Sequence, residues 1–333
     1  MKIDVHTHIM PEKMPNWTKK FGYGDFIHLE HHHPGCGKMM KGDTFFREIE
    51  SNCWDSESRL VDCEKHNVDI QVLSTIPVLF NYWAKPEHCL EISRFLNDDI
   101  AQRVEEHPDR FIGLGTIPMQ DSELAIKELE RIKNELKLPG IEIGTHVNGK
   151  NLDNPDLFPI LKACEDLDLA IFIHPWDMLG GDRLNKYWMK WLVSMPAETT
   201  TAIMSLIFGG VLDKLPNLRI CFAHGGGSYI GTLSRIKHGF DVRPDLIAVN
   251  TKKSPYDYFG MLYFDSLTHD KTMLKYLIEL AGFDRVCLGT DYPFPLGELE
   301  PGKLIDSIES FTTEQKDLLN YKTALNWLKI DSK

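Results

Sequence analysis

The sequence predicts an α/β fold, a (β/α)8 TIM barrel. Eight short runs of apolar and β-branched residues recur along the chain, and helical segments separate most of them. Strands that alternate with helices form a parallel sheet with both faces covered, and eight such units close naturally into a barrel. A chain of 333 residues is long enough for one such barrel. We expect strands at residues 3–8, 70–75, 111–118, 140–145, 170–174, 219–224, 261–265 and 286–291.

Helix-start signals place part of the outer layer of this barrel. We expect helices at residues 86–106, 122–135, 155–167 and 271–280. Pro86 and Pro155 suit the first turn of a helix, because a backbone N–H there has no intrahelical partner to lose. Ser122 begins a Ser-Glu-Leu-Ala run that is typical of a capped helix start.

Two segments depart from the alternation of strand and helix. Residues 10–55, after the first strand, are polar and rich in glycine and histidine, and residues 175–205, after the fifth strand, are rich in tryptophan and methionine. Long insertions in compact domains are often lids or binding loops. The three consecutive histidines 31–33 cannot all face one ion from a regular element, so we expect a solvated loop there. No repeat or flexible linker divides the chain, and we expect a single domain over residues 1–333.

Composition narrows the class of protein. A hydrophobic content of 42% supports a sizeable core, and a net charge of −12 argues against nucleic acid or an anionic membrane surface as the main partner. Asp4 and His6 interrupt any N-terminal apolar run, so we expect no signal peptide, and no apolar stretch is long enough to predict a membrane span. The seven cysteines are scattered without a Cys-x-x-Cys pair, which favours reduced thiols in the cytosol.

The first predicted strand carries a His-x-His pair. Side chains alternate along a strand, so His6 and His8 point the same way, and two imidazoles on one strand can hold one divalent cation. In a barrel the functional groups gather at the C-terminal ends of the strands. His8, His174, His224 and Asp291 end the first, fifth, sixth and eighth predicted strands. Each alone is compatible with an ordinary polar group at a strand end, but the four together indicate a site.

This constellation resembles the amidohydrolase superfamily. The pattern of that superfamily is His-x-His on the first strand, a histidine on the fifth, a histidine on the sixth and an aspartate on the eighth, and the five residues named above match it position by position. The fourth predicted strand ends without a lysine, so a single metal ion is the simpler interpretation than a lysine-bridged pair. Glu142 could replace that lysine in principle, but it lies early in its strand.

Further motifs are similar to one branch of the superfamily, the metal-dependent nonoxidative decarboxylases. They are Trp176-Asp177-Met178, Trp191, Met195-Pro196-Ala197-Glu198-Thr199, His224-Gly225-Gly226-Gly227 and the segment from Gly289 to Gly297. The similarity extends over essentially the whole chain.

The resemblance implies a metal centre with an acid/base group beside it. His6, His8, His174 and Asp291 would bind one Zn²⁺ per chain, since three neutral imidazoles and a carboxylate suit zinc, although cobalt, iron or manganese also fit this set. His224 would be the general acid/base, and an imidazole titrates near neutral pH as that role requires. A fifth ligand or a structural histidine are the alternatives for His224. Asp291 is also expected to accept a proton or to hold the metal-bound water.

The resemblance further implies a small, anionic, conjugated dicarboxylate from the kynurenine pathway of tryptophan catabolism as substrate. Arg47 matches a carboxylate-binding arginine of the family, and its planar fork suits bidentate recognition. Arg235 and Arg243 match arginines that a neighbouring subunit supplies, which implies a homodimer with shared sites. Three residues would form an apolar wall against the substrate, or else pack in the core: Trp191, Met178 and Phe294.

Two other functions stay open at this point. A hydrolase of a lactone or an amide in the same superfamily would use the same metal ligands, and only release of CO2 without consumption of water separates it from a decarboxylase. A non-enzymatic metal-binding or scaffold role on the same barrel would leave His224 without a purpose.

Overall fold

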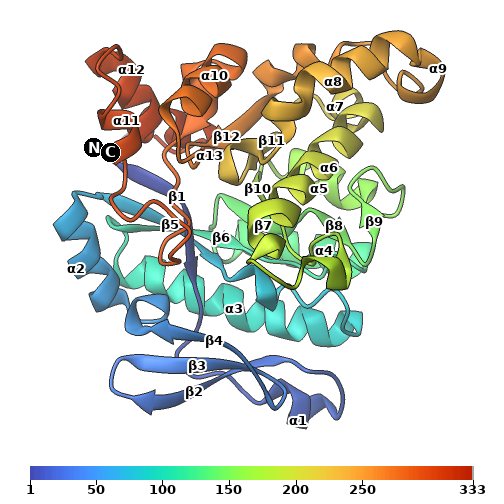
Figure 1. The fold of residues 1–333 in the computed structure, drawn as a ribbon. Helices are drawn as coiled ribbons and strands as arrows, with labels where there is room; N and C mark the ends of the chain where they lie inside the picture. The colour runs from blue at the N-terminus through green and yellow to red at the C-terminus, as the bar shows by residue number, and fades with distance from the viewer. Residues whose placement is uncertain (332–333) are drawn as a thin grey trace.

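The computed structural model describes residues 1–331 and forms the expected barrel. Its central sheet has eight strands in the order β1-β5-β6-β7-β10-β11-β12-β13, all paired in parallel, and Figure 1 shows helices arranged around them. The predicted fold class is therefore confirmed. The strands are β1 (Ile3–Ile9), β5 (Ile70–Thr75), β6 (Phe111–Gly115), β7 (Gly140–Gly144), β10 (Ala170–His174), β11 (Arg219–Phe222), β12 (Leu262–Asp265) and β13 (Val286–Cys287).

The last strand is shorter than predicted because the chain leaves regular pairing early. β13 ends at Cys287, and the residues after it close the barrel onto β1 through single backbone hydrogen bonds. Val5 N donates to Leu288 O at 2.9 Å, Asp291 N to His6 O at 2.8 Å, and His8 N to Tyr292 O at 2.7 Å. This irregular closure brings Asp291 beside the two histidines of β1.

Arg59, on helix α2 (Ser56–His66), ties the C-terminal end of β1 to its surroundings. The side chain is fully buried, and its Nη1 donates to the carbonyl oxygens of His8 at 2.7 Å and Asn52 at 2.9 Å. Its Nη2 donates to Thr7 Oγ1 at 3.0 Å, and its Nε donates to Gln71 Oε1 at 3.0 Å. A buried guanidinium is stable only when its donors are satisfied, so these bonds hold β1 in one position.

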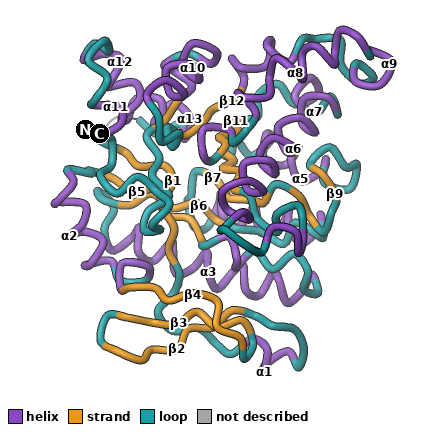
Figure 2. Tube along the Cα trace, viewed as in Figure 1, coloured by secondary structure: helices purple, strands orange, loops and turns teal. Residues whose placement is uncertain are grey.

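Helices cover the outside of the barrel, and Figure 2 shows them around the strands. α3 (Pro86–Glu106) has the predicted bounds, while α4 (Ser122–Asn134) and α10 (Lys271–Ala281) differ from the prediction by one residue at the C-terminal end. The cap of α4 is Asp121, whose carboxylate accepts from Leu124 N at 2.9 Å, rather than Ser122. α5 (Phe158–Asp166) begins after the predicted start at Pro155, and Pro159 occupies its first turn instead.

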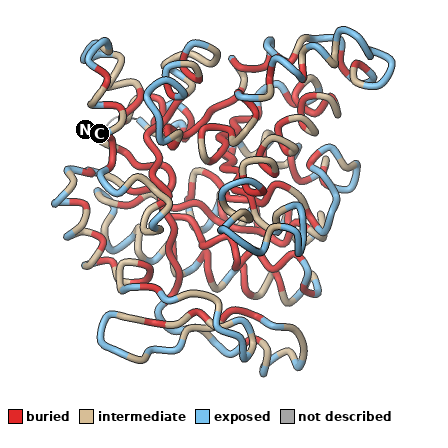
Figure 3. The backbone as a smooth tube through the Cα atoms, viewed as in Figure 1, coloured by how far each residue is buried: buried red, intermediate tan, exposed pale blue. Residues whose placement is uncertain are grey.

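Further helices complete the chain, and the sequence analysis did not assign them. They are α1 (Trp17–Phe21), α2 (Ser56–His66), α6 (Met195–Phe208), α7 (Val211–Lys214), α8 (Tyr229–Val242), α9 (Pro244–Ile247), α11 (Lys303–Asp306), α12 (Thr313–Asp317) and α13 (Thr323–Leu328). No helix in residues 1–331 is both long and apolar enough to span a membrane. Figure 3 shows buried residues along the barrel strands and exposed residues on the outer turns of the helices.

The first insertion is an antiparallel sheet rather than a loop. β2 (Ile27–His33), β3 (Cys36–Lys41) and β4 (Thr44–Glu50) form it at one end of the molecule, at the bottom of Figure 1. The expectation of a solvated loop at residues 31–33 is wrong, because these histidines end β2 and pair with β3. Apolar residues between this sheet and α3, among them Met39, Ile49 and Ile92, form a core of their own.

Two minor strands follow β7, and the second insertion follows β10. β8 (His146–Val147) and β9 (Lys150–Asn151) form a small hairpin after β7. The second insertion contains a short helical turn at Gly181–Leu184 and a π-helical turn at Lys190–Ser194 that leads into α6. Both insertions follow strands of the barrel at their C-terminal ends, which is where active sites lie in this fold.

Candidate metal centre and active site

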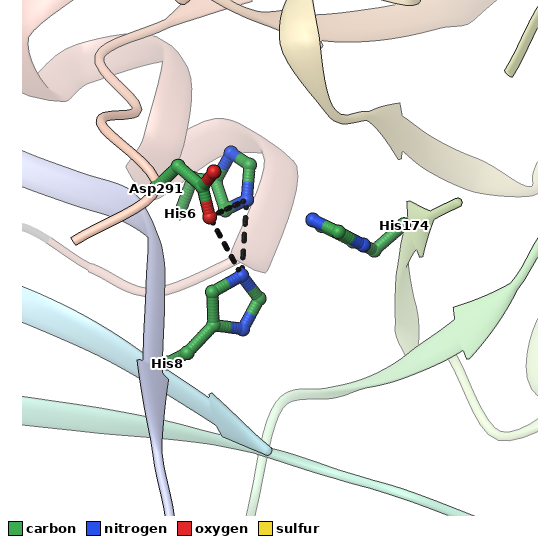
Figure 4. A group of neighbouring side chains, drawn as sticks. All are labelled: His6, His8, His174 and Asp291. Carbon is green, nitrogen blue, oxygen red and sulfur yellow. Dashed lines mark hydrogen bonds and ion pairs between the residues drawn. The ribbon is translucent and has the colours of Figure 1, made fainter. Parts of the chain in front are cut away.

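Four side chains converge inside the C-terminal end of the barrel (Figure 4). His6 and His8 come from β1, His174 ends β10, and Asp291 lies in the closure after β13. Asp291 Oδ1 lies 3.1 Å from His8 Nε2 and 3.4 Å from His6 Nε2, and the two Nε2 atoms are 3.2 Å apart. One ligand atom from each of the four lies within 4.8 Å of the others. A tetrahedral zinc site with bonds of about 2.0–2.1 Å separates its ligands by about 3.3 Å, so this spacing suits one cation.

The outward-facing nitrogens of the three imidazoles have hydrogen-bond acceptors. His6 Nδ1 lies 2.6 Å from Asp265 Oδ2, His8 Nδ1 lies 3.0 Å from the Thr75 carbonyl, and His174 Nδ1 lies 3.0 Å from the Pro175 carbonyl. A carbonyl oxygen only accepts, so Nδ1 of His8 and of His174 carries the proton and Nε2 offers its lone pair. His174 Nε2 is buried without a hydrogen-bond partner in residues 1–331. Orientation of this kind is typical of histidines that ligate a metal.

The pKa directions of His8, His174 and Asp291 agree with a metal site. Burial lowers the pKa of His174 well below its usual value, and the neighbouring histidines lower it further. Burial also lowers the pKa of His8. Burial alone would raise the pKa of Asp291, but the surrounding histidines, His6 foremost, hold it well below the usual range. Neutral imidazoles and an ionised carboxylate are the protonation states that a divalent cation requires.

His224 lies beside this cluster and is not one of its four members. It begins a short turn (His224–Gly226) after β11, and its Nε2 lies 3.7 Å from Asp291 Oδ2. Its ring centroid is 4.9 Å from that of His174. Burial lowers the pKa of His224, but the Asp291 carboxylate beside it outweighs burial and raises the net pKa. Both His224 and Asp291 have φ near +60°, a costly conformation that residues at functional sites often adopt.

Asp265 is a site residue that the sequence analysis missed. Its carboxylate accepts from His6 Nδ1, from His224 N at 2.8 Å and from Gly225 N at 2.6 Å, so it holds a cluster member and the neighbouring histidine together. It ends β12, the seventh barrel strand. The rule that selected His174 and Asp291 as polar strand ends would have found it if applied to this strand.

A pocket opens from the cluster toward the two insertions. Arg47 of β4 lies in it, with its guanidinium carbon 4.7 Å from the centre of the Phe294 ring and 5.8 Å from the centre of the Trp191 ring. Within residues 1–331 the guanidinium has no hydrogen bond or ion pair, and the aromatic faces hold it by cation–π attraction. His8, His174 and Asp291 line the same pocket, as do residues not selected for it from the sequence, among them Phe46, Val78, Trp176, Trp188 and Met195.

Three residues that the resemblance implies as substrate-binding, Met178, Arg235 and Arg243, do not line this pocket within one chain. Met178 is half-buried two residues beyond Trp176. Arg235 is exposed on α8, and Arg243, just after α8, is exposed and pairs with Asp245 at 2.7 Å.

Comparison with known proteins places this barrel and its cluster in a family. The sequence profile of the amidohydrolase family matches residues 3–330. A 2-amino-3-carboxymuconate-6-semialdehyde decarboxylase of Dictyostelium discoideum is 56% identical over 331 residues, covering 99% of this chain and 92% of the relative. The enzyme of that name from Caenorhabditis elegans is 40% identical, covering 99% of this chain and 94% of the relative.

One solved structure with a similar fold contains a bound metal ion. The 5-carboxyvanillate decarboxylase of Novosphingobium aromaticivorans, complexed with manganese and 4-hydroxy-3-methoxy-5-nitrobenzoic acid, is 25% identical. It aligns with a TM-score of 0.75 over 84% of this chain and 82% of that chain. The fold and the cluster thus define an enzyme of the amidohydrolase class, and its relatives and the solved structure place it among the decarboxylases of that class. Within that class, the chain belongs to the family of 2-amino-3-carboxymuconate-6-semialdehyde decarboxylases.

Proposed function

We propose that this enzyme catalyses the zinc-dependent, nonoxidative decarboxylation of 2-amino-3-carboxymuconate 6-semialdehyde to 2-aminomuconate 6-semialdehyde. This reaction would lie in the kynurenine pathway and divert flux away from quinolinate. The observation that carries the proposal is the unpaired cation of Arg47, which shares an aromatic-walled pocket with three members of the metal-ligand cluster. A flat, conjugated substrate with two carboxylates fits a pocket that offers a cation at one side and a metal at the other.

The metal would be held by His6, His8, His174 and Asp291, one ion per chain. When bound, zinc would supply a Lewis acid and would lower the pKa of a coordinated water toward about 7. The solved relative holds manganese, and our proposal of zinc rests on the set of three imidazoles and one carboxylate.

His224 would move the proton in this reaction. Its Nε2 faces the Asp291 carboxylate, and its raised pKa suits a group that holds a proton at neutral pH. It would give the proton to the substrate carbon that carries the departing carboxylate. The C–C bond to the carboxylate then breaks, its electron pair restores the conjugated system, and CO2 leaves without a free carbanion. His224 is then neutral and takes up a proton from water. Asp291 would hold the metal, and the charge of its second oxygen would stabilise the protonated form of His224.

Arg47→Ala is expected to raise KM by about 10- to 100-fold, since a charge-assisted hydrogen bond is worth about 1.5–3 kcal/mol. The value of kcat should change less, because Arg47 is not among the four residues of the metal-ligand cluster. Arg47→Lys should recover only part of the affinity, as lysine keeps the charge but loses the planar fork. Steady-state kinetics would measure this, with Arg183→Ala, an exposed arginine of the second insertion, as control. An unchanged KM would remove Arg47 from substrate binding.

We also propose a homodimer in which Arg235 and Arg243 of each subunit complete the active site of the partner subunit. Within each subunit, Trp191, Met178 and Phe294 would form the apolar wall of the site. Both arginines are exposed, and so are the apolar residues Val242 and Leu246 beside Arg243. Exposed apolar residues near these arginines support a subunit interface at this surface.

Mixed dimers test this sharing. A dimer of one Arg47→Ala chain and one Arg235→Ala chain has one site with both arginines intact, if the sites are shared. We therefore expect the mixture, assayed at substrate concentrations below the KM of either variant, to be more active than either parent dimer. Verified mixed dimers with no more activity than the parents would contradict sharing.

The cellular location, the domain organisation and the excluded partners belong to the same proposal. All seven cysteines are free thiols, six of them buried, which supports a cytosolic enzyme. We propose one catalytic domain over residues 1–333, with neither nucleic acid nor a membrane as partner.

An assay on purified, metal-analysed protein tests the function directly. Freshly prepared substrate would be followed by its ultraviolet absorbance while CO2 is trapped in parallel. We expect loss of substrate with matching CO2, abolished by a chelator and restored by zinc. Substrate loss no faster than spontaneous cyclisation would contradict the proposal, and turnover of a lactone or amide without CO2 would favour the hydrolase instead.

A further inference from the structure

Glu142 is a fully buried carboxylic acid in the barrel, close to the metal-ligand cluster but not part of it. It is the third residue of β7, and it pairs in register with Phe172 of β10, two residues before His174. The His6 ring lies 5.0 Å from the Phe172 ring, centroid to centroid, so Phe172 and its register partner lie near the ligands. Neither carboxyl oxygen of Glu142 has a hydrogen-bond partner in residues 1–331.

The Glu142 carboxyl faces the outer nitrogen of one ligand. Its Oε1 lies 3.7 Å from His8 Nδ1, the nitrogen that points away from the cluster. The Thr75 carbonyl at 3.0 Å and the Ser74 hydroxyl at 3.4 Å share that side of the ring. His6 is held in the same way by Asp265 at 2.6 Å. Two of the three histidine ligands therefore have a carboxyl group behind them.

Packing does not explain this burial. A second fully buried glutamate, Glu128, shows what a structural role requires. Its carboxylate accepts from Arg94 at 3.0 Å, from Arg131 at 2.8 Å and from Asn97 at 2.7 Å. Glu142 has none of these compensating bonds, and a buried polar group without partners lowers the stability of a fold. Such groups persist where function requires them.

We propose that Glu142 is a positioning residue of the metal centre. The Thr75 carbonyl accepts from His8 Nδ1, and the Glu142 carboxyl stands beside it at 3.7 Å as a second oxygen group behind the ring. There it favours the orientation in which Nε2 faces the cation and strengthens that nitrogen as a ligand. The inference rests on the metal site of the proposed function and assigns a residue to it that is neither a ligand nor an acid/base group.

Two variants separate positioning from packing. Glu142→Met removes the acceptor oxygens at similar length and is expected to raise the apparent Kd for zinc about tenfold, the lower end of the range for such residues. Glu142→Gln keeps one acceptor oxygen and should lose less affinity. In both, the unfolding temperature of the metal-free protein should stay level or rise, because an unpaired buried acid is removed. The control, Glu128→Gln, should lower the unfolding temperature and leave zinc affinity unchanged.

Metal-free wild type and variants would be titrated with zinc against a chromophoric chelator, and the visible spectrum of each cobalt-loaded protein would report ligand geometry. Weaker binding and a shifted cobalt spectrum in Glu142→Met, without loss of thermal stability, would support the inference. Equal zinc affinity and an unchanged spectrum in both variants would overturn it, as would a fall in unfolding temperature like that of Glu128→Gln with normal zinc affinity. A wild type that binds no cation would instead overturn the metal centre of the proposed function, and this inference with it.

Discussion

Replacing His224 by alanine is expected to lower kcat by about a thousandfold while the metal content stays the same. General acid/base groups contribute about 10²- to 10⁴-fold, and His224 is the histidine beside the cluster that is not among its four members. His6, His8, His174 and Asp291 converge without it, so the metal should remain. A fifth ligand would behave differently, because its loss would also reduce metal content.

The measurement pairs steady-state kinetics with metal analysis of the same protein. His238→Ala, which removes an exposed histidine of α8, is the matched control and should leave both quantities unchanged. Partial rescue of His224→Ala by added imidazole would support a proton-transfer role. Full activity in the alanine variant would remove His224 from the acid/base assignment, and a loss of metal parallel to the loss of rate would make it a ligand.

Much of the barrel could be predicted because its strands are local patterns. β5 and α3 have the predicted bounds, since an apolar run of strand length and a proline-started amphipathic segment are signals within the segment itself. The end of the eighth strand could not be predicted in this way. Its closure depends on contacts with β1 from the other end of the chain, such as the Asp4 carboxylate that accepts from Thr290 N at 3.1 Å.

The antiparallel sheet of the first insertion could not be predicted from local sequence patterns. β2 ends in three histidines, and its apolar alternation is limited to Ile27 and Leu29, which is too short to mark a strand through residue 33. It forms because β3 supplies its hydrogen-bond partners, with pairs such as Glu30 and Lys38 across the ladder. Arg47 is a similar case, since only the folded chain brings the Phe294 ring to it from a distant part of the sequence.

Site residues at regular strand ends were the easiest to find. His174 follows an apolar run that is buried throughout, so its place at the mouth of the barrel follows from the pattern. Asp265 has the same signal, but its role behind His6 depends on a contact across the barrel that spacing does not reveal. The groups behind the ligands are therefore harder to assign from sequence than the ligands themselves.

Asp291→Ala is expected to lower both the metal content and the rate, each severely. Asp291 is the only anion among the four members of the cluster, and its Oδ1 lies within 3.4 Å of both histidines of β1. Three neutral imidazoles hold a divalent cation less firmly without that charge. After dialysis against zinc-free buffer we expect well below one metal per chain and a fall in kcat of at least about a thousandfold, with Asp166→Ala, an exposed aspartate, as control.

Asp291→Asn separates the two roles assigned to this residue. It keeps the shape and an oxygen donor but not the charge, so saturating zinc should restore metal content more readily than in the alanine variant. The rate should stay low even then, because the second oxygen faces His224 at 3.7 Å and its charge raises the pKa of that imidazole. The optimum of kcat should also move to lower pH, since His224 without its anionic neighbour gives up its proton more easily. Full recovery of rate at saturating zinc would leave Asp291 as a ligand alone, and unchanged zinc content in both variants would show that it is not a ligand.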